Sequence, residues 1–472
     1  MIVDKAIRIA LDKSSPSIKY FLVKWLQEFG PFERVEKSVI AISAELGVSK
    51  DVVSKATSYL TTNGYFEKET VLTTKRWSRY SFKCSTKLKN ELIDLGDGGN
   101  SHHVALIEHL LINDIQRRSG TTVRRHSLDL APKLLLIILL RNANECGVVD
   151  HLGLSALAKL TGLSKESVKA RIEHLLKRGY IRSYVPGVTG RHLYHRSPGI
   201  IYINLKHQNY AIEQKTGLTT YIQSNSIGRN PNEAMTMFTV AKHILTVHKH
   251  DVITVEQSNL IRRNCNNSFF FIPKSEDFIK LAYFFTDPLM YSKLNVFMQA
   301  KINGYASALL SEQWNALSQR SVIESDHIKK TIANDTFGKN FNKDSNEGVF
   351  PSKQQKEGLV NFLFDTSVAL AKRMQGQLNQ VTEAKFGNMN HVIIPTLDTG
   401  NHRLRVAIDS FPNVNDKYSY NKCIKINADY LEPSKSIVDE EYEISLEDEY
   451  NYGLLTKPEK KVFYVGDKTI TL

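Results

Sequence analysis

A twenty-residue segment, residues 47–66, recurs 115 positions later as residues 162–181, and this internal repeat constrains the fold more than any other feature of the chain. Aligned without a gap, the two copies share seven identical residues, which are Gly, Ser, Lys, Val, Leu, Gly and Tyr in that order. Unrelated segments of this length would share roughly one residue by chance. The chain therefore builds one structural unit twice.

Each copy has the residue order of a helix with defined ends. A Gly suited to a tight turn is followed two positions later by a Ser, Ser49 or Ser164, which is a residue type that caps helix N-termini. About fourteen residues with a helical pattern follow, and a Gly-Tyr pair then ends the helix and opens a strand. This order predicts the second half of a helix-turn-helix followed by a β-hairpin wing.

The flanking residues predict a complete module around the first copy. Apolar side chains recur at helical spacing from Ile18 to Phe29 and stop at Gly30-Pro31, which ends a helix. Tyr80 and Phe82 alternate with polar residues, as in a strand. The expected elements are helices over 16–29, from 38 to 46 and from 49 to 63, and strands from 65 and over 78–84, joined by a basic loop at 73–76.

The second copy lies in a similar setting. Val168, Ile172 and Leu175 are expected to face the core, and Lys165, Glu166, Lys169 and Arg171 to face solvent. The expected elements are helices over 133–143, 155–160 and 164–178, and a wing from residue 180 through a loop at 187–192 to a strand at 200–205.

Residues 38–66, with Ala44-Glu45-Leu46-Gly47-Val48-Ser49-Lys50 at their centre, resemble the winged-helix domain of the GntR class of bacterial regulators. Residues 133–205 resemble the wider MarR-like and GntR-like winged-helix superfamily, and the tandem arrangement resembles plasmid replication initiators. The resemblance implies two winged helix-turn-helix domains that bind double-stranded DNA. The usual partner domains of the GntR class are not visible downstream, so no effector is implied.

The distribution of charge also indicates a nucleic-acid partner. Residues 1–210 contain 32 Lys and Arg against 19 Asp and Glu, whereas residues 211–472 contain 30 of each. The whole net charge of +13 therefore lies in the half that holds the repeat. Such a surface attracts phosphate through Coulomb steering and counterion release. The alternative is a soluble protein that is simply rich in Lys.

DNA contacts are expected from exposed polar residues of the two helices and wings. Helix residues can reach base edges in the major groove, and wing residues can hold phosphates. The predicted helix contacts are Ser49, Lys50, Ser54, Lys55, Ser58, Ser164, Lys165, Lys169 and Arg171. The predicted wing contacts are Lys75, Arg76, Arg79, Thr189, Arg191 and Arg196. For any one of these residues, the alternative is a charge or hydroxyl that only improves solubility.

A helix at 102–115 and a basic segment connect the two modules. The arginine pairs Arg117-Arg118 and Arg124-Arg125 suit a phosphate backbone or a minor groove. A solvated basic linker explains them equally well.

The neutral half contains no recognisable chemical motif. A buried strand is expected at 268–273, and a stripe of Leu359, Phe362, Leu370, Met374 and Leu378 on a long helix suits core packing or a homodimer seam. Seven carboxylates in residues 439–449 suit a solvated loop, a Mg²⁺ site or a mimic of DNA phosphates. From residue 391 the apolar period changes to two, which is typical of strands.

The expected fold class is α+β, with two winged-helix domains followed by a mostly helical region and a β-rich C-terminal region. The expected segments are 1–95 (first winged helix), 96–129 (connecting helix and basic linker), 130–210 (second winged helix), 211–333 (mostly helical), 334–351 (linker) and 352–472 (long helix and β-rich domain).

Several classes of protein are disfavoured. The four Cys are widely spaced, and His243, His248 and His250 lack the spacing of zinc ligands on a helix, so we expect no disulfide, metal or cofactor. The N-terminus lacks a signal-peptide pattern, and the longest aliphatic run, 134–140, is far too short for a membrane span, so we expect a cytoplasmic protein. No catalytic motif is readable, and we expect no enzymatic activity.

The function expected from these patterns is a bacterial or mobile-element transcriptional regulator with two DNA-binding heads. One alternative is a plasmid or phage replication initiator that binds iterated repeats. Another is a DNA-acting enzyme with its catalytic domain in the C-terminal half. A further alternative is that the first head packs against protein, because Val52 occupies a position expected to be exposed.

Overall fold

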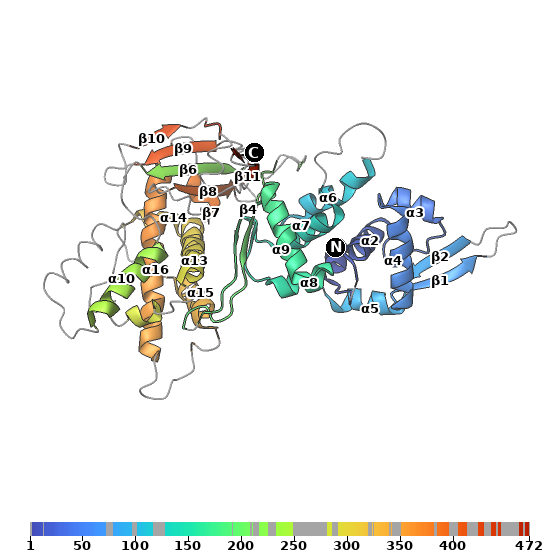
Figure 1. Ribbon diagram of the computed structural model, residues 1–472, viewed down its shortest axis with the longest axis horizontal. Coiled ribbons are helices and arrows are strands. Elements are labelled where there is room, and N and C mark those ends of the chain that lie inside the picture. The colour runs from blue at the N-terminus through green and yellow to red at the C-terminus, as the bar shows by residue number, and fades with distance from the viewer. Residues whose placement is uncertain are drawn as a thin grey trace. The chain divides into compact units, whose positions relative to one another are not determined.

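The computed structural model shows a mixed α+β protein, as the sequence predicted at the level of fold class. The structure describes residues 2–12, 14–71, 79–96, 102–116, 128–190, 192–207, 210, 217–224, 233–248, 281–285, 291–319, 323, 325–338, 341, 351–381, 385–395, 405–412, 423–428, 436–439, 442–444, 462–465 and 468–471. The chain forms two compact units: the first comprises Met1–Gly187 and Ser197–Lys215, and the second comprises Val188–Arg196 and Thr216–Leu472 (Figure 1).

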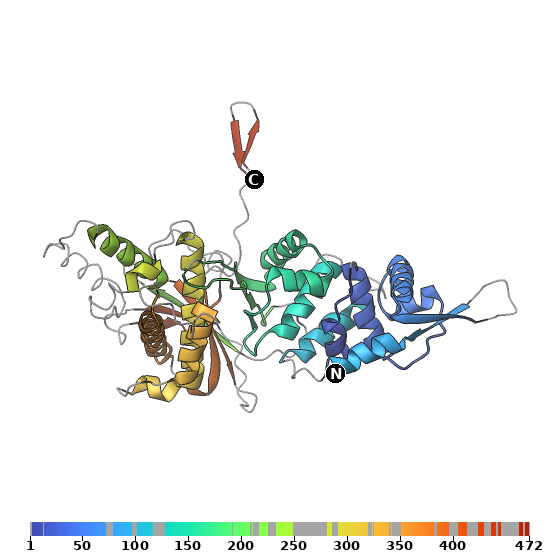
Figure 2. The same cartoon turned by 90° about the horizontal axis from the view of Figure 1, so that it is seen from below.

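The first unit contains two modules of helices and short antiparallel sheets, which Figures 1 and 2 show from two directions. Its elements are α1 (Ile2–Arg8), α2 (Pro16–Glu28), α3 (Val39–Glu45), α4 (Lys50–Thr62), β1 (Phe66–Val71), β2 (Arg79–Cys84), α5 (Thr86–Asp94), α6 (Val104–Gln116), α7 (Leu130–Asn142), β3 (Val148–Val149), α8 (Leu154–Thr161), α9 (Lys165–Lys177), β4 (Ile181–Val185) and β5 (Ile200–Ile203). These bounds confirm, to within a few residues, the helices and strands that the sequence predicted around the two copies of the repeat.

An aromatic cluster forms the core of the first module. Trp25 of α2 is fully buried and packs against Phe21, Phe29, Phe66 and Phe82. Phe66 and Phe82 lie on β1 and β2, which pair antiparallel. The apolar face of α2 therefore joins the helices to the hairpin, and burial of so much aromatic area stabilises the module.

In the second module, the middle of α7 has apolar residues on all of its faces, and the fold buries all of these faces. All seven residues of the aliphatic run 134–140 are fully buried. The helix packs against α8 and α9 of its own module, against the connecting helix α6, and against α1 and α2 of the first module. Strands β3, β5 and β4 form a three-stranded antiparallel sheet in that order.

Buried polar contacts join the two modules within the first unit. The Lys24 ammonium on α2 donates to the carbonyl oxygen of Leu111 on α6 at 2.9 Å, and Asp4 of α1 pairs with Arg141 of α7. These contacts position the two modules relative to each other.

The second unit combines a five-stranded sheet with a group of helices. Its elements are β6 (Leu218–Ser224), α10 (Glu233–His248), η1 (Ala282–Phe285), α13 (Tyr291–Glu312), α14 (Trp314–Ser318), α15 (Asp326–Phe337), α16 (Lys353–Leu378), η3 (Phe386–Asn388), β7 (Met389–Ile394), β8 (Arg405–Pro412), β9 (Cys423–Ala428), β10 (Ile437–Asp439), β11 (Val462–Val465) and β12 (Lys468–Thr471). The strand order is β10-β9-β6-β8-β7, and only β6 and β9 are parallel. α13 packs on β7, and α13, α15 and α16 lie together on one side of the sheet (Figure 1).

Strand β6 was not predicted, because residues 211–333 were expected to be mostly helical. It occupies the centre of the sheet, where Thr219 and Thr220 are buried and the Thr219 hydroxyl donates to the Asp409 carboxylate at 2.5 Å. The segment expected to be a linker, 334–351, separates β6 from β8 in sequence, yet these two strands pair directly. α15 also continues to Phe337, inside the expected linker.

The apolar stripe of α16 belongs to the core. Leu359, Phe362, Leu370, Met374 and Leu378 are all buried within the second unit. The core-packing interpretation is therefore correct, and this stripe is not free to form a homodimer seam. The strand expected at 268–273 and most of the acidic segment 439–449 lie outside the described residues.

Candidate nucleic-acid interface

The repeated residues build the same helix start in both modules. The backbone N–H of Val52 donates to the Oγ of Ser49 at 3.3 Å, and the N–H of Ser167 donates to the Oγ of Ser164 at 3.1 Å. Each hydroxyl satisfies one of the N–H groups that a helix N-terminus leaves without a backbone partner. Ser49 and Ser164 thus have a local role in setting where α4 and α9 begin.

The two helices also end in the same way. Gly64 and Gly179 adopt left-handed φ values of +71° and +74°. The N–H of the following Tyr then donates to a carbonyl oxygen five residues earlier, from Tyr65 to Leu60 at 2.8 Å and from Tyr180 to Leu175 at 3.0 Å. This is the Schellman arrangement, which favours Gly because the left-handed conformation carries no Cβ penalty there.

Most of the seven identities in the repeat are explained by the backbone or the core. Gly47 and Gly162 also have left-handed φ values, of +66° and +72°. The shared Val, Leu and Tyr are buried in both copies. The identical side chain that is exposed and takes no part in a helix end is the Lys in the first turn, Lys50 or Lys165.

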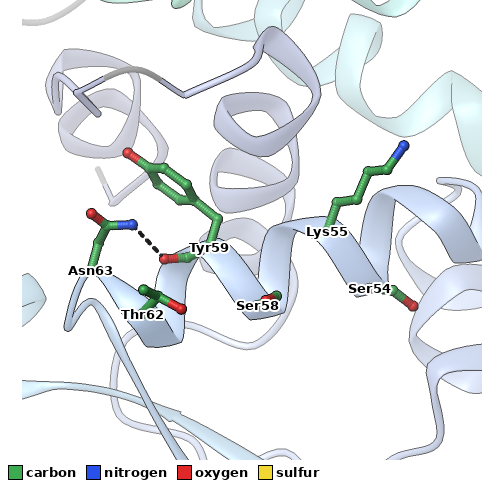
Figure 3. A pocket seen from close by; sticks show the side chains of 6 residues that line it. All are labelled: Ser54, Lys55, Ser58, Tyr59, Thr62 and Asn63. Atoms are coloured by element: carbon green, nitrogen blue, oxygen red, sulfur yellow. Dashed lines mark hydrogen bonds between the residues drawn. The ribbon is translucent and has the colours of Figure 1, made fainter.

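The outward face of α4 carries the residues that the sequence assigned to it. Lys50, Ser54, Lys55 and Ser58 are exposed, while Val53, Ala56, Thr57 and Leu60 are buried. A shallow depression on this face is lined by Ser54, Lys55, Ser58, Tyr59, Thr62 and Asn63 (Figure 3). Figure 3 shows Ser54, Ser58 and Thr62 following one another along the helix. Thr62 and Asn63 are exposed as well, and their spacing from Ser58 could have revealed them.

On α9, Lys165 and Lys169 are exposed as predicted, but Arg171 is half-buried, so its assignment to the exposed face was wrong. The repeat explains this difference. Arg171 aligns with Ala56, which is fully buried, so both side chains lie at the edge of the helix that faces the core. The exposed cations that the sequence reasoning missed are Lys177 and Arg178, at the end of the same helix.

Charges at the start of α9 are partly compensated. A backbone hydrogen bond and the Ser164 hydroxyl lower the pKa of the exposed Glu166 carboxyl, which is therefore ionised at neutral pH. Burial, together with Arg178 and Arg171, lowers the pKa of His174 on the same helix. At pH 7 the cations of α9 therefore lie beside the ionised Glu166 carboxylate and the neutral His174 imidazole, and the helix also carries Glu173.

The base of the first hairpin is paired internally. Lys83 of β2 contacts Glu67 at 3.0 Å and Glu69 at 3.2 Å, and Arg34 contacts Glu69 at 3.0 Å. Of the cations assigned to this wing, Lys75 and Arg76 lie outside the described residues. Arg79 begins β2, and its side chain is outside the described part as well.

Residues 188–196, in the loop between β4 and β5, belong to the second unit. Tyr194 is buried, its N–H donates to the carbonyl oxygen of Thr336 at 2.8 Å, and its ring meets Phe297 edge-on at 5.2 Å. Its φ of +52° is left-handed, which is uncommon for a residue with a Cβ. Thr189 and Arg196 are exposed on this loop, whereas Arg191 lies outside the described residues. Sequence reasoning treated the loop as a free wing tip and missed its Tyr194 anchor.

The arginine pairs between the modules, Arg117-Arg118 and Arg124-Arg125, also lie outside the described residues. Within the described part of the chain, no group of three or more His, Cys, Asp or Glu side chains could hold a metal ion. No helix in that part is both long and apolar enough to cross a bilayer. Comparison of the chain with protein-family models, curated proteins and solved structures finds no match.

Proposed function

We propose that the first unit binds double-stranded DNA through two winged helix-turn-helix modules. In this proposal α4 and α9 are the recognition helices, and the β1–β2 hairpin is the wing of the first module. Strands β4 and β5 take the place of the wing in the second module, although residues 188–196 between them belong to the second unit. The observation that carries it is the repeated frame: two helices with the same caps and buried positions, each presenting an exposed Lys, Lys50 or Lys165, in its first turn.

The chemistry of this arrangement suits DNA. A helix fits the major groove of B-DNA, and its first turns lie closest to the base edges and flanking phosphates in helix-turn-helix proteins. The N-terminal end of a helix also carries partial positive charge, which adds to the attraction of Lys50 and Lys165 for phosphate. The net charge of +13 on residues 1–210 supports the same partner.

The proposed site on DNA is composite. The contacts of Lys24 with Leu111 and of Asp4 with Arg141 hold the two modules in one unit, so α4 and α9 would meet one duplex together. Their exposed residues differ, so they should read two unlike elements, about one helical turn or roughly 10 base pairs apart. We propose that the chain regulates transcription of a bacterial or mobile-element gene from such a site.

Replication initiation is the second candidate. The observation that favours it is that both modules belong to one compact unit, since plasmid initiators also pair two winged helices in tandem. A regulator should bind one site beside a promoter, whereas an initiator should bind a series of direct repeats.

Selection of bound duplexes from a random-sequence library, with the full chain, tests the proposal. We expect enrichment of two unlike elements at fixed spacing, and none with a Lys50→Glu, Lys165→Glu double variant. A matched double reversal at Lys330 and Lys353, which are exposed in the second unit, should leave enrichment intact. Failure of the wild-type chain to enrich any sequence would refute the proposal.

A further inference from the structure

Four exposed positions on α4 differ in kind from the equivalent positions on α9. The first copy has Ser54, Ser58, Thr62 and Asn63, and the second has Lys169, Glu173, Lys177 and Arg178. All eight side chains are exposed. At these four positions α4 is uncharged and α9 is charged, whereas the exposed Lys55 of α4 aligns with Ala170 of α9.

Two of the remaining charges on α4 pair with each other. The Lys55 ammonium pairs with the Asp51 carboxylate one turn earlier at 2.8 Å. Lys50 is the first residue of the helix and does not line the depression, which Figure 3 shows with its hydroxyl-bearing residues Ser54, Ser58 and Thr62. The Asn63 side chain donates to the carbonyl oxygen of Tyr59 at 2.8 Å, which holds this one side chain at the end of the helix. The depression thus offers mainly neutral donors and acceptors.

Neutral and charged side chains bind DNA by different physics. Hydroxyls donate and accept hydrogen bonds over short distances and discriminate base edges, and their contacts release no counterions. Lys and Arg side chains at phosphates release condensed counterions, so their contribution falls steeply with salt and depends little on sequence.

We infer that the two heads hold DNA by unequal chemistry. α4 reads base edges through the neutral face of Ser54, Ser58 and Thr62, whereas α9 supplies most of the phosphate grip through Lys169, Lys177 and Arg178. This inference rests on the proposed function, since it assigns separate tasks to the two helices of that site. The DNA element under α4 is then the more sequence-specific of the two.

The test measures affinity as a function of salt for three full-length proteins on the selected duplex and on random duplex. The triple variant Lys169→Ala, Lys177→Ala, Arg178→Ala should flatten the slope of log K against log salt by up to about 2.7, at roughly 0.9 for each phosphate that is no longer neutralised. The matched triple variant Ser54→Ala, Ser58→Ala, Thr62→Ala should leave that slope unchanged. It should weaken binding to the selected duplex by about tenfold or more and leave binding to random duplex as in wild type. Equal slope changes in the two variants would overturn the inference.

A graft gives a gain-of-function control. The graft replaces the exposed α4 residues by those of α9, with Ser54→Lys, Ser58→Glu, Thr62→Lys and Asn63→Arg. It should steepen the slope of log K against log salt. It should also remove the sequence preference at only one of the two DNA elements. A graft that keeps the wild-type slope and preference would contradict the inference even if all variants fold, which circular dichroism checks. If the wild-type protein binds no duplex at all, the proposed function is refuted. If it binds DNA but the variants behave alike, only the division of tasks between α4 and α9 is refuted.

Discussion

The carbonyl oxygen of Ser14 lies directly against Gly162, so that a Cβ added to Gly162 would overlap with it. Gly162 lies in the tight turn between α8 and α9, and Ser14 lies in the segment between α1 and α2. The turn of the second module therefore packs on backbone of the first module, and Tyr59 of α4 bonds to the same segment at Asp12. One short stretch of chain contacts both heads.

Replacing Gly162 by Ala should destabilise the first unit strongly. The variant combines a left-handed φ of +72° with a backbone clash. Gly64→Ala is the matched control, because Gly64 has a φ of +71° and open space around its Cα. We expect the control to cost about 1–2 kcal/mol of unfolding free energy and Gly162→Ala clearly more. Equal losses in urea unfolding would show that Ser14 does not constrain the turn.

The buried position of Lys19 leads us to expect that the first unit becomes more stable as pH rises above neutral. Its buried ammonium donates to the carbonyl oxygen of Ala6 at 2.7 Å and to that of Ile9, and so caps α1. Burial lowers the pKa of Lys19 from 10.5 to about 7, and Glu91 opposes this shift. Between these values the unfolded chain binds a proton that the folded chain does not, so the first unit should gain stability as pH rises from about 7 toward 10.

The Lys19→Met variant should lose this gain, because it removes the titrating group. A background with Trp77 and Trp314 replaced by Phe would leave Trp25 as the fluorescent probe of the first unit. Above pH 10 the raised pKa of Tyr59 and that of Tyr65 act in the opposite direction, so the comparison is confined to lower pH. The same pH profile in both proteins would exclude Lys19 as its source.

His391 predicts acid sensitivity in the second unit. Its Nε2 lies 3.0 Å from the carbonyl oxygen of Phe386 and must donate to it, so Nδ1 accepts from the Ser410 hydroxyl at 2.9 Å. Burial lowers the pKa of this neutral imidazole from 6.5 to about 4, although the Phe386 bond favours the proton. The unfolded chain therefore gains a proton first as pH falls, and stability should drop between about 6.5 and 4.

The His391→Gln variant keeps a donor and an acceptor but does not titrate. Its urea midpoint should fall less than that of wild type between pH 6.5 and 4.5, where ordinary carboxylates contribute equally to both proteins. Parallel pH profiles would show that His391 is already charged in the folded state.

The sequence predicted elements best where the backbone itself demands a residue type. Gly47, Gly64, Gly162 and Gly179 all adopt left-handed φ values, and Ser49 and Ser164 cap helices, so these residues fix where α4 and α9 begin and end. Helical spacing also separated buried from exposed residues along α4.

Tertiary contacts account for what the sequence did not reveal. The sequence of β6 does not alternate between apolar and polar residues because both faces of the strand are buried. The buried Thr219 hydroxyl bonds to Asp409, which is 190 positions away in sequence. Arg171 was assigned by its charge, although the position aligns with the buried Ala56. Tyr194 is held by contacts with Thr336 and Phe297, which are distant in sequence. The residues near Tyr194 in the chain therefore gave no sign that this loop is anchored.

Hydroxyl-radical footprinting of the full chain on its selected duplex tests the central claim most directly, with wild type, the Lys50→Glu and Lys165→Glu variants, and the variant that carries both substitutions. We predict two protected elements about one helical turn apart, of which Lys50→Glu loses one and Lys165→Glu loses the other. Protection of both elements by a protein that carries both substitutions would contradict the two-headed account.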